Sequence, residues 1–215
     1  MEISLRFPQT RDRGAPDRTV GAGVRSGENS CVTAKKPLAA LVPMNNMWTT
    51  VSDNPTLFLY IPQTGATSAE LLIVDDQNKD VYWTSLNLQS LPGVVQLTPP
   101  QTVVLEPGKT YTWYLALGCD LEHSTDTFYV QGLLERTELT DEQKVKLAQA
   151  KDPLKQAQVY ADAQIWQETL AIMAKLRQDN PNDPKIAQEW KELLKSIELE
   201  WLATEPLVNC CSPTN

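Results

Sequence analysis

The sequence predicts an α+β protein, in which an antiparallel immunoglobulin-like β-sandwich is followed by a small C-terminal helical hairpin and a third helix. Three observations predict this fold class. About seven strand-like runs recur between residues 37 and 139, with Pro, Gly and polar turns between them. No helical crossover separates the runs, which favours a sandwich over an α/β fold. After Leu139 the period of the apolar residues becomes helical.

The first part of the chain differs from the rest in charge. Residues 1–36 hold seven Lys or Arg and four Asp or Glu, whereas the whole chain of 215 residues has a formal net charge of −8. This Arg- and Gly-rich arm has few large apolar residues, so we predict that it is a disordered, solvated leader. The alternative is that the basic arm folds back onto the acidic body or contacts an anionic partner.

The domain prediction follows from these changes in composition. The arm is followed by a β-sandwich domain at 37–139, a helical tail at 140–204 and a Cys-containing segment at 205–215. The strand-like runs are KPLAALVP, TLFLYIP (56–62), SAELLIVDD (68–76), DVYWTSLNL (80–88), GVVQLTPP, TYTWYLALG (110–118) and DTFYVQGLLERTEL.

Two local signals refine the strands. The polar Gln77-Asn78-Lys79 between residues 68–76 and 80–88 predicts a hairpin, and imperfect alternation in 80–88 predicts a bulge or twist near Thr84-Ser85. The run LEPGKTY, which ends at Tyr111, resembles the tyrosine corner of immunoglobulin and fibronectin-type sandwiches. That resemblance implies a hydrogen bond from Tyr111 to backbone a few residues upstream, a structural role.

Helix starts are marked by capping residues. Thr140 and Gln143 form a capping box, and Pro153 and Pro184 each follow an Asp at the first helical position. The stretch 153–178 is long for one helix and has no internal breaker, which predicts a hidden helix–turn–helix.

This stretch resembles a tetratricopeptide unit. Ala157, Tyr160, Trp166 and Pro181 stand at the spacings of that repeat, whereas Thr169, Met173 and Leu176 depart from it. Only one unit is present, so two interpretations stay open: a docking groove for a protein, or a helical buttress for the β-domain. Tyr160, Trp166 and Trp190 serve equally well as core or contact residues.

Composition excludes several classes of function. The acidic balance argues against nucleic-acid binding, and no apolar run is long enough to span a membrane. The single histidine, His123, stands in a polar run at 118–126 that we expect to be a solvated hairpin loop. Asp76 begins a D-x-N-x-D run, but Val81 and Asn87 replace the glycine and glutamate of a calcium loop. We predict no catalytic, cofactor-binding or metal-ligating residue, and no cofactor.

The even number of cysteines predicts disulfides. The candidates are Cys31, Cys119, Cys210 and Cys211. Adjacent cysteines rarely bond each other without backbone strain, so we predict that Cys119 pairs with Cys210 or Cys211 and that Cys31 takes the other. A thiol cluster for metal and reduced cysteines are the alternatives.

Several segments in order resemble a cyanobacterial family of uncharacterised extracytoplasmic proteins, domain of unknown function 928. They are RDRGAPDRTVGAGVRSG, Cys31, PLAALVP, TVSDNPTLFLYIP, AELLIVDDQNKDVYWT, LEPGKTYTWYLALGCD, FYVQGLLERTEL, AQVYADAQIWQETL and EPLVNCC. The resemblance implies an exported, periplasmic protein that starts with a signal peptide, and it implies no activity. MEISLRFPQT contains no signal peptide, so the true start lies upstream, the chain is a mature form, or the protein stays inside.

These observations favour a non-enzymatic protein-interaction or scaffolding protein that is exported in a cyanobacterium, with a protein partner. One alternative is a hydrolase that uses the 119–126 loop, and substitution of His123 discriminates between the two. Another is a carbohydrate-binding sandwich with Trp48, Trp83 or Trp113 exposed as a stacking platform.

Overall fold

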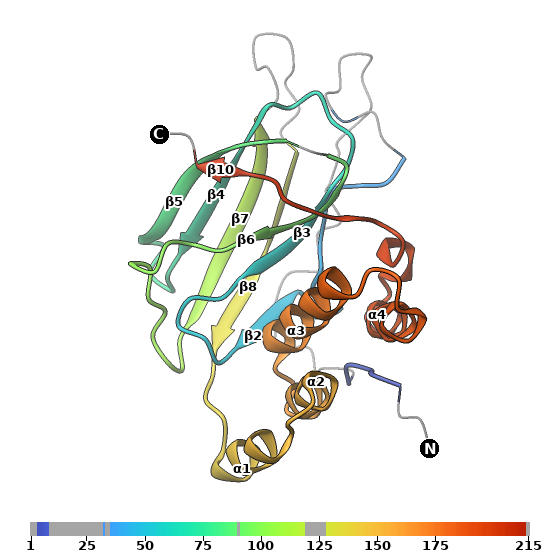
Figure 1. Cartoon of the computed structure of the whole chain (residues 1–215). Coiled ribbons are helices and arrows are strands. Elements are labelled where there is room, and N and C mark those ends of the chain that lie inside the picture. The colour runs from blue at the N-terminus through green and yellow to red at the C-terminus, as the bar shows by residue number, and fades with distance from the viewer. Residues whose placement is uncertain (1–3, 9–31, 33–34, 90, 119–127, 214–215) are drawn as a thin grey trace.

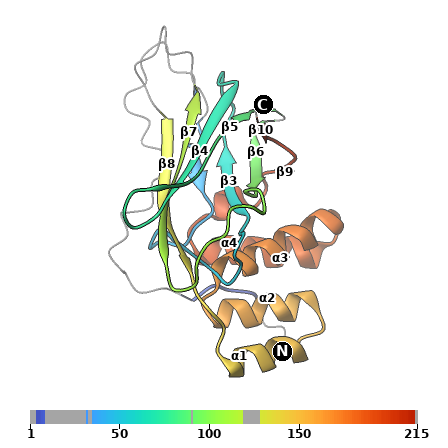
Figure 2. The ribbon, with the colours of Figure 1, turned by 90° about the vertical axis from the view of Figure 1, so that its left-hand side faces the viewer.

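The computed structural model describes residues 4–8, 32, 35–89, 91–118 and 128–213. The described chain forms two β-sheets and four α-helices, which confirms the α+β class (Figure 1). Figure 2 shows the two sheets as adjacent layers, with the helices gathered at one end of them.

The larger sheet has six strands in the order β10-β5-β4-β7-β8-β2. The bounds of these strands are β2 Met47–Thr50, β4 Ser68–Val74, β5 Asp80–Asn87, β7 Thr110–Gly118, β8 Phe128–Arg136 and β10 Ser212–Pro213. The smaller sheet has four strands in the order β1-β3-β6-β9, with bounds β1 Ala39–Ala40, β3 Leu57–Ile61, β6 Gly93–Leu97 and β9 Leu207–Val208. The strand-like runs of the sequence therefore all contain strands.

The prediction of purely antiparallel sheets is wrong at two edges. β2 pairs with β8 in parallel, and β9 pairs with β6 in parallel. Both additions are short segments that come from outside the run of hairpins, so their direction is set by tertiary packing rather than by a tight turn. They extend the two sheets with strands that the sequence pattern does not reveal.

The predicted hairpin at 75–79 is present, but the bulge lies elsewhere. The Asp75 carboxylate accepts hydrogen bonds from the N–H groups of Gln77 and Lys79, and Asn78 has a positive φ of 60°. The register between β4 and β5 shifts between Ile73 and Val74, so Val81 is the extra residue. The prediction of a bulge at Thr84-Ser85 is wrong, because pairing with β4 is continuous there.

The Tyr111 hydroxyl accepts a hydrogen bond from the Glu106 backbone N–H at 2.8 Å. This is the contact that the LEPGKTY run predicts, and it spans the turn in which Gly108 has φ +74°. It fixes the start of β7 against the preceding loop.

All three predicted helix starts are confirmed. Thr140 and Gln143 make both hydrogen bonds of a capping box, and Asp152 and Asp183 each cap a helix that begins with Pro. The stretch 153–178 divides at Gln164, which has φ +60°. The helices are α1 Asp141–Gln149, α2 Pro153–Asp162, α3 Trp166–Asp179 and α4 Pro184–Ser196, followed by a 3-10 turn at Glu200–Leu202. No described helix has the length and apolarity that a membrane crossing requires.

The helices and sheets share one hydrophobic cluster. At its centre the carbonyl of Leu41 accepts hydrogen bonds from two indole N–H groups, those of Trp48 at 3.0 Å and Trp166 at 2.7 Å. Trp48 also stacks on Trp113, with ring centroids 4.2 Å apart. Because Trp48 belongs to β2 and Trp166 is the first residue of α3, the helical layer is anchored directly on the six-stranded sheet.

Glu168 on α3 makes a second contact between the helices and the sheets. One of its carboxylate oxygens, Oε1, accepts hydrogen bonds from the Thr50 hydroxyl and from the N–H groups of Val51 and Ser52. The other, Oε2, is buried and has no hydrogen-bond partner among the described residues. Burial raises the pKa of this carboxyl, and the three hydrogen bonds only partly oppose that effect.

Candidate functional site

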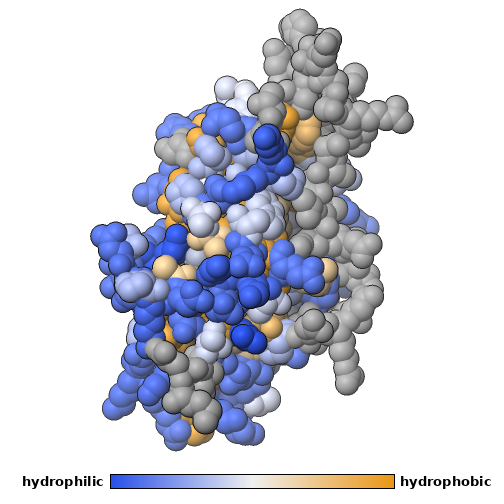
Figure 3. All heavy atoms as spheres, turned by 90° about the vertical axis from the view of Figure 1, so that its right-hand side faces the viewer, coloured by the Kyte–Doolittle hydropathy of each residue, from blue (hydrophilic) through white to orange (hydrophobic). Residues whose placement is uncertain are grey.

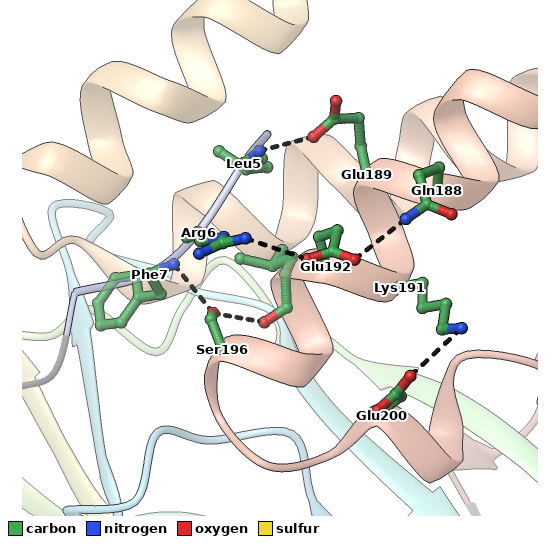
Figure 4. Close-up of polar contacts among 10 residues, drawn as sticks. Leu5, Arg6, Phe7, Gln188, Glu189, Lys191, Glu192, Ser196 and Glu200 are labelled. Atoms are coloured by element: carbon green, nitrogen blue, oxygen red, sulfur yellow. Dashed lines mark hydrogen bonds and ion pairs between the residues drawn. The ribbon is translucent and has the colours of Figure 1, made fainter. Parts of the chain in front are cut away.

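Residues 4–8, which we call the N-terminal segment, lie against α4 (Figure 4). Leu5 and Phe7 are buried, with exposed fractions of 1% and 3%, whereas the side chain of Arg6 between them is 71% exposed. The alternation is that of an extended chain with one face on a core. The prediction that the arm is disordered is therefore wrong for this segment, because its two large apolar side chains are buried. Residues 9–31 lie outside the described residues.

Two polar side chains of α4 satisfy the backbone of the N-terminal segment. The N–H of Leu5 donates to Glu189 Oε2 at 2.6 Å, and the N–H of Phe7 donates to Ser196 Oγ at 3.0 Å. The Ser196 hydroxyl in turn donates to the Leu193 carbonyl at 2.6 Å. Residues 189 and 196 are two helical turns apart, so they present both acceptors on one side of α4.

The exposed residue of the segment meets a charge on the same helix. The guanidinium of Arg6 lies 3.6 Å from the Glu192 carboxylate, which also accepts a hydrogen bond from the Gln188 amide at 3.0 Å. An ion pair with one highly exposed partner contributes only about 0–1 kcal/mol. Burial of Leu5 and Phe7 therefore supplies most of the stability of this contact, and the ion pair adds a preference for a basic residue between them.

Phe7 contacts Trp166, which links the helices to the sheets. Its ring meets Trp166 edge to face, with centroids 4.9 Å apart and planes at 79°. Trp166 is fully buried. The N-terminal segment thus packs on the same tryptophan that anchors α3 on the six-stranded sheet.

Two hollows flank the N-terminal segment. One, of about 500 Å³, lies between the starts of α2 and α4 and the end of α3; Leu5, Leu154, Leu176, Ile186 and Glu189 contribute to its wall. The other, also about 500 Å³, has Ser4, Arg6, Gln188 and Glu192 in its wall. We call the face of α4 that the N-terminal segment covers, together with these two hollows, the α4 groove. The seats of Leu5 and Phe7 are the buried positions that these two side chains occupy in it. Figure 3 shows the right-hand side of Figure 1 as a mostly hydrophilic surface, with hydrophobic residues visible only between polar ones.

The local sequence explains why α4 presents this face. Asp183 caps the helix, accepting from the N–H groups of Lys185 and Ile186. The buried residues of α4 are Ile186, Glu189, Trp190, Leu193 and Leu194. Glu189 is therefore a charged residue within an apolar stripe. That anomaly is a signal for this site that the predictions from the sequence did not use.

The tryptophans proposed as a sugar-stacking platform divide into two kinds. Trp48 and Trp113 are fully buried and stack on each other, so neither is exposed as that hypothesis requires. Trp83 on β5 is 57% exposed. Of the helical aromatic residues, Trp166 and Trp190 are core residues and Tyr160 is partly buried.

The cysteine prediction needs correction. Cys210 and Cys211 are bonded to each other, so neither pairs with Cys119 or Cys31 as we predicted. Cys211 has φ +75°, the left-handed conformation that accommodates this turn between neighbours. Cys31, Cys119 and the whole His123 loop at 119–127 lie outside the described residues. Within the described part of the chain, no cluster of His, Cys, Asp and Glu side chains is suited to a metal ion.

Comparison with known proteins gives a family and no activity. No curated protein matches the chain. Residues 20–207 match the model of a family described as Domain of Unknown Function (DUF928), which spans most of the chain. The protein is therefore a member of the DUF928 family.

Proposed function

We propose that this protein is a non-enzymatic interaction protein whose α4 groove holds a short extended peptide with an apolar–basic–apolar pattern. One observation carries the proposal: the chain's own Leu5, Arg6 and Phe7 occupy the groove in this manner. The backbone contacts of Leu5 and Phe7 are to residues 184 and 189 positions later in the chain. The partner is a protein segment of the same pattern, which takes the place of the N-terminal segment.

The chemistry of the groove supports that class of ligand. Glu189 and Ser196 accept from backbone N–H groups, which every non-proline residue offers, so they supply affinity without sequence preference. Preference comes from the buried seats of Leu5 and Phe7 and from Glu192, whose charge favours a basic residue between them.

The N-terminal segment competes with a partner peptide for the α4 groove. Because it belongs to the same chain, a partner competes with an effective concentration on the order of millimolar. A free peptide should therefore bind weakly to the intact protein and more tightly once the N-terminal segment is prevented from docking.

Two finer expectations belong to this proposal. The tetratricopeptide-like spacing of Ala157, Tyr160 and Trp166 on α2 and α3 fits a helical layer used for docking. An extracytoplasmic location in a cyanobacterium, which the family resemblance implies, fits the Cys210–Cys211 disulfide, because disulfides persist in oxidising compartments.

The test uses the full chain with Leu5→Asp, which places a charge in the buried seat and evicts the segment. A fluorescent peptide ISLRFPQT is titrated against this variant and against the unchanged protein, with anisotropy as the readout. We expect binding to the variant to be at least about tenfold tighter than to the unchanged protein, because the internal competitor is removed.

Two controls make the result specific. A peptide with Asp in place of its Leu should not bind, and the variant Leu5→Asp with Ser196→Ala should bind ISLRFPQT more weakly. Leu5→Ser, a milder polar change at the same buried position, replaces Leu5→Asp if circular dichroism shows that the latter is unfolded. A folded variant that does not bind ISLRFPQT would refute the proposal.

A further inference from the structure

A third hollow shares no wall residue with the two hollows of the α4 groove. It has a volume of about 510 Å³ and lies where the end of α3 meets strand β9. Its wall is made by Arg177, Gln178, Pro181, Pro206, Leu207 and Asn209. The wall thus includes one arginine, two residues with amide side chains and three apolar residues.

Arg177 is the unusual member. It is half-buried, yet among the described residues its guanidinium makes no ion pair and no hydrogen bond. The neighbouring cation, Lys175, is paired with Asp179 at 3.0 Å. In a chain with a net charge of −8, an unpaired and partly desolvated arginine is unexpected, because loss of water around a charge costs free energy that a partner normally offsets.

We infer that this hollow binds a carboxylate carried on a small apolar body, with Arg177 as the anion-binding residue. A guanidinium presents two parallel N–H donors that match the two oxygens of a carboxylate. Gln178 and Asn209 offer neutral amide donors beside it, and Pro181, Pro206 and Leu207 offer apolar contact to the rest of the ligand. The single positive charge fits a monoanion better than a phosphate dianion.

Burial also acts on the arginine itself. Desolvation lowers the pKa of Arg177 from its ordinary value, and no neighbouring charge opposes this effect. The guanidinium stays protonated, so the consequence is a cation that gains from any anion placed against it.

The experiment titrates the full chain with benzoate and with benzamide, its neutral counterpart, and follows the backbone and arginine side-chain signals by NMR. We expect benzoate to shift signals of residues 177, 178 and 207–209, and benzamide to bind at least about tenfold more weakly, the value expected for a charge-assisted hydrogen-bonded pair. The carboxylate could belong to a small aromatic acid or to the C-terminus of a peptide. The tripeptide Ala-Ala-Leu, with a free C-terminus and with a C-terminal amide, distinguishes these two sources. Binding of the free-acid tripeptide as tight as that of benzoate indicates a peptide C-terminus.

Matched variants locate the effect. Arg177→Met should lose benzoate binding by at least about tenfold, while Lys175→Met, which removes a paired cation from the same helix, should leave it unchanged. Arg177→Lys, which keeps the charge without the fork, gives an intermediate loss and serves if Arg177→Met is unfolded. Equal binding of benzoate and benzamide, unchanged affinity in a folded Arg177 variant, or no binding at all would overturn the inference.

Discussion

Glu189 on α4 accepts a hydrogen bond from the backbone N–H of Leu5, with donor and acceptor 2.6 Å apart. Glu189 is buried on an apolar helix stripe, where an acid without a partner would be costly. The N-terminal segment supplies that partner. The bound segment therefore accounts for a buried acid on the apolar face of α4, and that acid accounts for the position of the segment.

Removal of the Glu189 acceptor should loosen the N-terminal segment. Glu189→Ala leaves the buried Leu5 N–H without a partner, at an expected loss of about 1–3 kcal/mol in the free energy of unfolding. Glu189→Gln keeps an acceptor and should lose less. Urea denaturation measures both, with exposed Lys195→Ala as the matched control on the same helix. Equal stability of Glu189→Ala and the control would contradict this role of Glu189.

Truncation of the buried anchor should cost more. Leu5→Ala removes a side chain that is almost fully buried, and large-to-small changes at such positions cost about 2–5 kcal/mol. The same kind of change at Met44, which is exposed, should cost less than about 0.5 kcal/mol. Thermal denaturation of the two variants distinguishes an anchored segment from a loosely associated one, for which both changes would be near neutral.

Much of the fold was predictable because its signals are local. Thr140 with Gln143 and Asp152 with Pro153 mark helix starts, and Glu106 with Tyr111 closes the predicted corner within five residues. Each of these contacts is made between neighbours in the chain, so the sequence contains both partners within one window.

The features that escaped prediction depend on partners far apart in the chain. β2 is a four-residue strand whose parallel partner β8 lies some eighty positions later, and no turn joins them. The seat of Leu5 and Phe7 is formed by a helix near the other end of the chain. In the Cys-containing segment, adjacent cysteines rarely bond each other, yet Cys210 and Cys211 do, with Cys211 in the left-handed conformation.

Glu168 should make stability depend on pH. Burial raises its pKa in the folded protein above the ordinary value of 4.5. Its protonated form therefore stabilises the fold fully below about pH 4.5, and this contribution is lost as the pH rises through the folded-state pKa. Glu168→Gln should flatten the fall in unfolding free energy as the pH rises above about 4.5, whereas Glu70→Gln, at an exposed position, should not. An unchanged pH profile in Glu168→Gln would contradict this role.

The Cys210–Cys211 disulfide should hold the last strand in place. β9 pairs with β6 in one sheet and β10 pairs with β5 in the other, and the disulfide lies between them. A dithiol reductant supplies two electrons and two protons to open it, which releases Cys211 from its left-handed conformation. Hydrogen exchange at Asn87, which pairs with Ser212 of β10, should then accelerate, while exchange in β3 stays constant.

A double variant separates this disulfide from any other thiol. Cys210→Ser with Cys211→Ser should show the accelerated exchange at Asn87 without reductant, and should not respond further when reductant is added. Slow exchange at Asn87 in the double variant would mean that β10 is held by other contacts.

The exchange rate of two backbone amides in the intact protein, measured by NMR, tests the α4 groove without any added ligand. We predict that the N–H groups of Leu5 and Phe7 exchange at least about tenfold more slowly than in the free peptide ISLRFPQT. We also predict that Glu189→Ala removes protection at Leu5 and that Ser196→Ala removes it at Phe7. Exchange of both amides at the rate of the free peptide would show that α4 does not hold an extended segment by its backbone.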